Sequence, residues 1–90
     1  MSHEAQLEYL RKIDSVLLAL REQLSADEVA AVRHLVDHGE PAEGLCSLAW
    51  IIHKNQKPVA TDMRRTIADL ASGLVEEAHM PESFRGLASP

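Results

Sequence analysis

The segment Asp37–Leu45 constrains the fold more than any other part of this chain, because it ends one helix and begins the next. Gly39 suits the left-handed backbone position just past a helix end, since it has no Cβ to clash. Pro41 suits the first turn of the following helix, where its missing N–H is not needed. Glu40 and Glu43 then lie at a helix N-terminus, where the helix dipole favours negative charge. The segment therefore predicts two helices joined by a sharp, acidic corner.

Apolar residues recur every three or four positions along most of the chain, which is the period of an amphipathic helix. Start and stop signals divide this pattern into four predicted helices, at residues 3–24, 26–38, 41–54 and 61–79. Ser25 and Glu28 have the spacing of a capping box. Pro58 ends the third helix, and Thr61 is the N-cap candidate of the fourth. Because the connections are short, the sequence predicts an all-α fold, a compact antiparallel bundle of about four helices.

A chain of 90 residues is long enough for one domain. We expect residues 1–80 to form the bundle and residues 81–90 to form a flexible C-terminal tail, from which Phe84 and Leu87 could dock on the bundle. The predicted core comprises the residues on the apolar stripes: Leu17, Leu20, Val32, Leu35, Leu48, Ile52, Ile67, Leu70 and Leu74. Trp50, the single tryptophan, is expected in the core rather than at an interface.

The charge balance favours a basic protein partner over nucleic acid. Nine Lys and Arg residues against 14 Asp and Glu residues give a net charge of −5, which repels phosphates and attracts basic proteins. The candidate partner-binding residues are the carboxylates Asp37, Glu40, Glu43, Asp62 and Asp69. The alternative is that these side chains only keep the protein soluble and compensate the helix dipoles.

The sequence gives little support to an enzyme or a metal site. His34 and His38 are four positions apart, but a zinc site needs further ligands. Cys46 is the only cysteine and lies in an apolar run, where we expect a small core residue. No nucleophile, phosphate-binding or metalloprotease motif is present. Arg64 and Arg65 fit a solvated helix face. We therefore predict no catalysis and no cofactor.

The N-terminus has neither the basic region nor the apolar region of a secretory signal. The apolar runs are only a few residues long, which is too short for a membrane-spanning helix. Together these features predict a cytoplasmic protein with no membrane partner.

The run Leu35–Leu48, LVDHGEPAEGLCSL, resembles the helix–GE(P/Y)–helix corner of small bacterial immunity proteins of the MafI type. In size, acidity and helical class the chain is also similar to the colicin D immunity group, and the resemblance covers about Leu24 to Leu74. It implies a protein that binds and neutralises a cognate toxin of a polymorphic or contact-dependent system. The toxin's nuclease domain, often a ribonuclease or tRNase, would offer a basic cleft to an acidic inhibitor.

Two other functions remain open from the sequence. One is a small homodimeric helical adaptor or regulatory subunit that pairs through its first helix. The apolar residues that would form this seam are Leu10, Ile13, Leu17, Leu20 and Leu24. The other is a small-molecule or metal-binding bundle.

Overall fold

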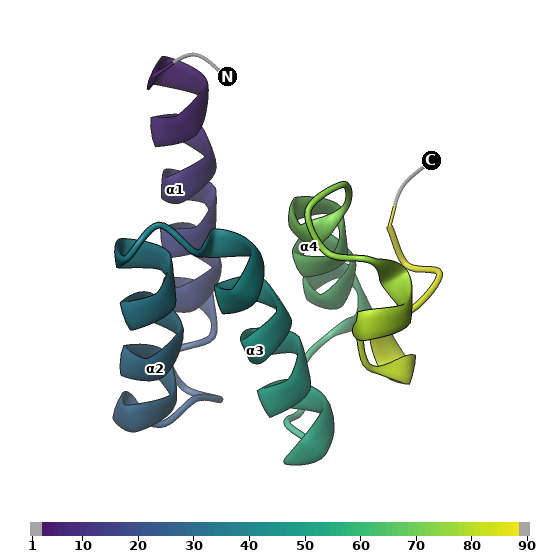
Figure 1. Ribbon diagram of the computed structural model, residues 1–90. Helices are drawn as coiled ribbons and strands as arrows, with labels where there is room; N and C mark the ends of the chain where they lie inside the picture. Colours follow the sequence, from purple (N-terminus) through teal and green to yellow (C-terminus); the bar gives the residue numbers. More distant parts are fainter. Residues whose placement is uncertain (1–2, 89–90) are drawn as a thin grey trace.

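The computed structural model describes residues 3–88, which fold into helices with no strand among them. The elements in chain order are α1 (His3–Ala19), α2 (Ala26–Asp37), α3 (Pro41–Lys54), α4 (Thr61–Ala71) and two 3-10 turns, η1 (Glu77–His79) and η2 (Glu82–Phe84). Helices α2 and α3 lie side by side, and α1 extends beyond the other helices at its N-terminal end (Figure 1). The chain after α4, residues 72–88, is here called the C-terminal segment, and it lies beside α4. The predicted all-α class is confirmed.

The first helix is shorter than the predicted 3–24, because α1 ends at Ala19 and the chain turns as far as Leu24. The amide of Arg21 bonds to the Leu18 carbonyl and that of Gln23 bonds to the Leu20 carbonyl, so the backbone tightens. This turn allows Ser25 to adopt the extended backbone that an N-cap requires.

Ser25 and Glu28 form the predicted capping box at the start of α2. The Glu28 amide donates to Ser25 Oγ at 3.1 Å, and the Ser25 amide donates to Glu28 Oε1 at 2.8 Å. Glu28 also pairs with Lys57 Nζ at 3.0 Å and accepts from Asn55 Nδ2 at 3.1 Å. One carboxylate therefore joins the start of α2 to the connection between α3 and α4. The Ser25 amide, and after it Lys57, lower the pKa of Glu28.

These contacts predict an acid-sensitive contribution to stability. The pKa of Glu28 is lower in the folded protein than its ordinary value of 4.5. The stabilisation is therefore present above pH 4.5 and is lost as the pH falls through the folded pKa. We expect Glu28→Gln to lower the melting temperature at neutral pH, with the difference from wild type shrinking in acid. Asp27→Asn is the matched control in the same turn, and a Glu28→Gln difference that stays constant from neutral to acidic pH would contradict the assignment.

The predicted corner between α2 and α3 is a Schellman motif. Gly39 has a φ of +79°, its amide bonds to the Val36 carbonyl, and the Glu40 amide bonds to the Leu35 carbonyl. Pro41 then opens α3. Further along, a Cβ on Gly44 would lie only 2.8 Å from Val36 Cγ2. Glycine at position 44 therefore permits the close approach of α2 and α3.

The core lies where the four helices and the C-terminal segment meet. Six of the predicted core residues are buried, namely Leu17, Leu20, Val32, Leu48, Ile52 and Ile67. Leu35 and Leu70 are only partly buried. The predictions for Leu74 and Trp50 are wrong, because these side chains are 48% and 42% exposed. The indole N–H of Trp50 donates to the His79 carbonyl at 2.8 Å, so its polar atom has a partner.

The predicted fourth helix, 61–79, is also wrong beyond α4. The helix ends at Ala71, and Gly73 takes a φ of +85°, which turns the chain back. Leu74 therefore leaves the helical stripe that predicted its burial.

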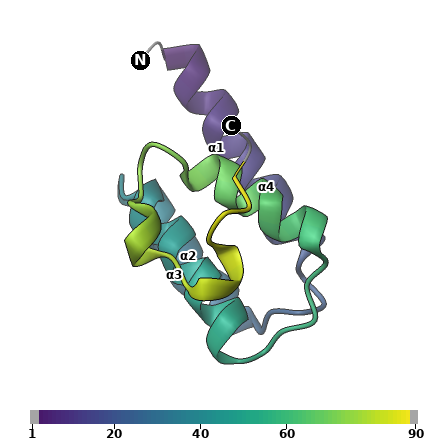
Figure 2. The same ribbon diagram turned by 90° about the vertical axis from the view of Figure 1, so that its right-hand side faces the viewer.

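The C-terminal segment then crosses α3 and α4 (Figure 2). Arg64 donates to the Ser83 carbonyl at 3.1 Å, and His53 Nδ1 lies 2.9 Å from Ser83 Oγ. Phe84, in the segment expected to be a loose tail, is 2% exposed and belongs to the core. That expectation does not hold for the chain around Phe84, and residues 89–90 lie outside the described part. Every helix among residues 3–88 is too short or too polar to cross a lipid bilayer.

Candidate partner-binding groove

An open groove of about 780 Å³ lies between α1, the α2–α3 corner and the C-terminal end of α4. Its lining combines apolar side chains with three charged ones. The lining includes Tyr9, Leu10, Lys12, Asp37, Asp69, Leu70 and Leu74. We refer to this feature as the α1–α4 groove.

A hydrogen bond between distant parts of the chain joins two sides of the α1–α4 groove. The Tyr9 hydroxyl donates to the Leu70 carbonyl at 2.6 Å, across 61 positions of sequence. That carbonyl belongs to the last turn of α4, where a helix leaves its acceptors without intrahelical donors. Burial raises the pKa of Tyr9, so the phenol stays protonated and keeps donating. The contact holds α1 against the end of α4.

The charges on the α1–α4 groove are predominantly acidic. Asp37 comes from the last turn of α2 and Asp69 from α4, and both are exposed. Lys12 from α1 lies on the same groove. Two carboxylates against one amine give a negative local potential beside the apolar Leu10 and Leu74. Such an arrangement suits a partner that presents both basic and apolar groups.

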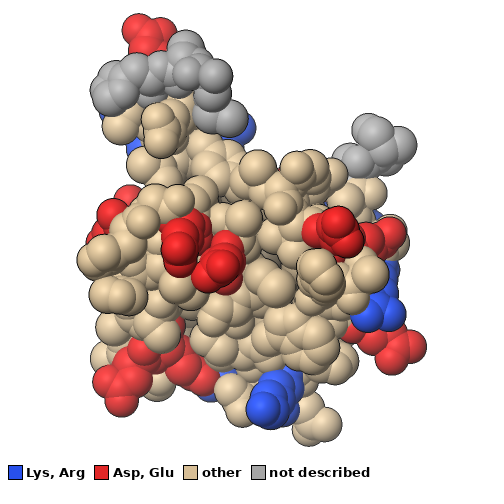
Figure 3. Space-filling model, viewed as in Figure 1, with Lys and Arg blue, Asp and Glu red and all other residues tan. Residues whose placement is uncertain are grey.

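The structure brings only two of the five predicted site residues together on this groove, Asp37 and Asp69. Glu40 occupies the N-cap position of α3 without a side-chain capping bond, and Glu43 lies in the first turn of α3. Both are exposed, as the dipole argument expects. Asp62 lies at the other end of α4, within 3.8 Å of Arg65. Figure 3 accordingly shows acidic side chains in separate clusters on the face it displays.

The apolar part of the groove is not predicted by the sequence pattern, which places Leu74 in the core. The pair Ser72–Gly73 was the available signal, because a glycine after a polar residue is a common helix C-terminus. With a helix end there, Leu74 would have been placed in a surface turn.

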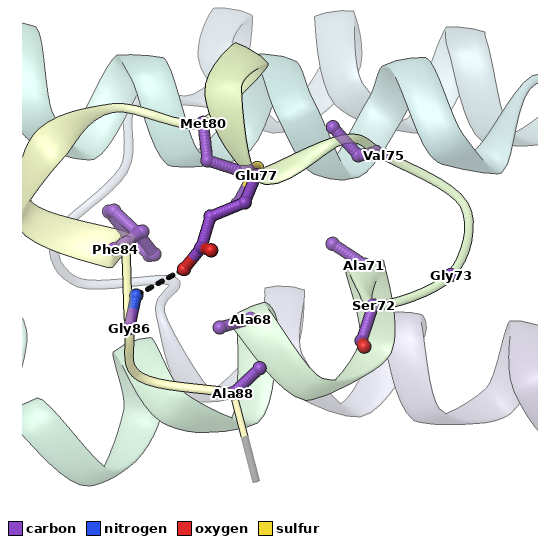
Figure 4. Close-up of a pocket in the computed structure, with 10 residues that line it drawn as sticks. All are labelled: Ala68, Ala71, Ser72, Gly73, Val75, Glu77, Met80, Phe84, Gly86 and Ala88. Atoms are coloured by element: carbon purple, nitrogen blue, oxygen red, sulfur yellow. Dashed lines mark hydrogen bonds between the residues drawn. The ribbon is translucent and has the colours of Figure 1, made fainter. Parts of the chain in front are cut away.

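A second cavity, of about 430 Å³, lies between α4 and the C-terminal segment (Figure 4). Small residues from both sides line it, among them Ala68, Ala71 and Gly86. Its one carboxylate, Glu77, accepts a hydrogen bond from the Gly86 amide. Glu77 is therefore used to close the C-terminal segment on itself, and the cavity offers little chemistry to a ligand.

The remaining candidate groups have structural contacts. The rings of His34 and His38 contact each other at a tilt of 40°, with centroids 4.1 Å apart, and residues 3–88 contain no group of three or more His, Cys, Asp or Glu side chains placed to hold a metal ion. The Cys46 thiol donates to the His79 carbonyl at 3.6 Å. Burial raises the pKa of Cys46, which keeps the thiol in its poorly nucleophilic protonated form.

Together the fold and the groove define a small all-α protein with an open, acidic and partly apolar surface groove. Comparison of the chain with models of known protein families, with curated protein sequences and with solved structures found no match.

Proposed function

We propose that this protein is an immunity protein that acts in the cytoplasm. It would bind a cognate bacterial toxin and neutralise it by covering the basic active-site cleft of a nuclease or tRNase domain. The observation that carries the proposal is that Asp37 and Asp69 line one groove beside the exposed Leu74. Such a role needs neither catalysis nor a cofactor nor direct contact with nucleic acid.

The charge of the chain supports this proposal in two ways. A net charge of −5 speeds the encounter with a basic protein through long-range attraction. On contact, Asp37 and Asp69 replace the phosphates for which a nuclease cleft is built. The exposed part of Leu74 then loses its contact with water, which adds an apolar contribution that nucleic acid cannot supply.

The proposal expects a secreted toxin with a nuclease domain to be encoded beside this gene, and the test uses that nuclease domain. We expect the wild-type protein to bind that domain and to stop its cleavage of RNA. The double variant Asp37→Lys/Asp69→Lys should weaken binding by about tenfold or more, since a hydrogen bond to a charged group contributes about 1.5–3 kcal/mol. Calorimetric titration at low and high salt measures the effect, and binding should weaken as salt screens the charges.

A matched control changes two exposed carboxylates that lie outside the groove, Glu22→Lys/Asp27→Lys, with the same change in net charge. Circular dichroism of both double variants checks that the fold is retained. Equal affinity for wild type and the groove variant at low salt would contradict the proposal. If Glu40→Lys/Glu43→Lys weakens binding instead, the partner contacts the α2–α3 corner and not the groove.

A further inference from the structure

Six exposed residues form a continuous stripe along the outer side of α1 and the turn that follows it. Their spacing alternates between three and four positions, as in the seam of a coiled coil. The stripe, here called the outer α1 face, comprises Glu4, Leu7, Arg11, Asp14, Leu18 and Arg21. Its two leucines are 40% and 63% exposed, although leucine is normally a core residue.

The outer α1 face differs from the dimer seam expected from the sequence. Ile13, Leu17, Leu20 and Leu24 of that expected seam are buried inside the monomer. A dimer through those side chains would require the domain to open. The outer α1 face is available without any such rearrangement.

The outer α1 face is complementary in charge to a second copy of itself that runs in the opposite direction. Counted in sequence positions, Arg11 and Asp14 are equally far from the midpoint between residues 12 and 13, and so are Leu7 and Leu18. Glu4 and Arg21 are also equidistant from that point. Two copies packed antiparallel about a two-fold axis there would place each acid opposite a base and each leucine opposite a leucine. A parallel pair would instead place Arg11 against the partner's Arg11, which is repulsive.

We propose that the outer α1 face binds a second copy of this chain in this antiparallel, two-fold arrangement. Asp14 also pairs with Arg33 at 2.9 Å within the monomer. A carboxylate has two acceptor oxygens, so it can receive the partner's Arg11 as well. The pair of Arg11 with Glu8 is long, at 3.9 Å, and both side chains are mostly exposed, so it competes weakly.

The shape of the molecule is compatible with this arrangement. The N-terminal half of α1 extends beyond the other helices, which leaves it free to lie along the partner's α1 (Figure 1). The helical part of the face, from Glu4 to Leu18, spans about 21 Å, at about 1.5 Å per residue, and belongs to the small, weakly associating class of interfaces. The dimer forms at high protein concentration and dissociates as salt rises. None of its six residues lines the α1–α4 groove, so the inference does not rest on the proposed function.

Sedimentation equilibrium of the full chain from about 10 µM to 1 mM, a range suited to weak interfaces, tests the proposal at low and high salt. Wild type should dimerise at low salt. Arg11→Asp alone and Asp14→Arg alone each bring like charges together, and should lower the association constant by about tenfold or more. An equimolar mixture of these two variants should form heterodimers, and the double variant Arg11→Asp/Asp14→Arg should regain self-association.

Lys54→Asp, at an exposed position of α3, makes the same charge change as Arg11→Asp and is the control that should leave the dimer intact. Leu18→Glu is a further disrupting variant that does not involve the Asp14–Arg33 pair, and circular dichroism checks the fold of each variant. A wild type that remains monomeric at 1 mM and low salt would overturn the proposal, as would single variants that associate like wild type. A mixture of the two charge variants that stays monomeric would overturn the antiparallel pairing.

Discussion

Replacing Phe84 with alanine should destabilise the protein by about 3–5 kcal/mol, the usual cost of removing a buried aromatic ring. Phe84 is 2% exposed and joins the C-terminal segment to the helical core. Its loss leaves a cavity and also frees the segment that covers α3 and α4. Small domains have a total stability of about 5–15 kcal/mol, so the loss is a large part of the whole. Urea denaturation followed by far-ultraviolet circular dichroism measures it.

Leu87→Ala is the matched control in the same segment, because Leu87 is only partly buried. It should cost clearly less than Phe84→Ala. If the Phe84→Ala variant loses less than about 1 kcal/mol, the range of surface substitutions, the C-terminal segment is not part of the cooperative domain.

Leu48→Ala is the second substitution with a large expected effect, about 2–5 kcal/mol, since Leu48 is fully buried on α3. Leu74→Ala, which removes the same atoms from an exposed side chain, should change stability by only about 0.5 kcal/mol. The comparison tests the corrected end of α4. Were Leu74→Ala to cost as much as Leu48→Ala, the core would extend to Leu74 as the sequence pattern predicted.

The parts of the fold that the sequence predicted correctly depend on local signals. The start and end of α3 match the predicted 41–54, because Gly39 and Pro41 determine the backbone near its start and Pro58 lies close to its end. The start of α2 follows in the same way from the Ser25–Glu28 capping box.

The incorrect parts depend on contacts between distant residues. Gly73 can lie inside a helix or just past its end, so the Ser72–Gly73 pair alone does not outweigh the apolar stripe that continues to Leu74, and the docking of Phe84 accompanies the turn seen there. Trp50 follows the buried Leu48 and Ala49 on α3, but its side chain is exposed and contacts the His79 carbonyl, 29 positions away.

The candidate site was predictable only in part for the same reason. Composition pointed to carboxylates, and Asp37 and Asp69 were both among the candidates. Their common groove exists because the Tyr9 hydroxyl holds α1 against the end of α4. No spacing rule predicts a contact between residues so far apart in sequence, so the apolar side of the groove could not be assigned.

The contact between Trp50 and the His79 carbonyl gives the protein an intrinsic optical reporter. Trp50 is the chain's single tryptophan, so all indole fluorescence comes from the place where α3 meets the C-terminal segment. Detachment of that segment removes the indole's hydrogen-bond acceptor and exposes the ring further to water, while the backbone of α1 to α4 can remain helical. A shift in emission at lower denaturant concentration than the loss of ellipticity would therefore separate the release of the C-terminal segment from global unfolding.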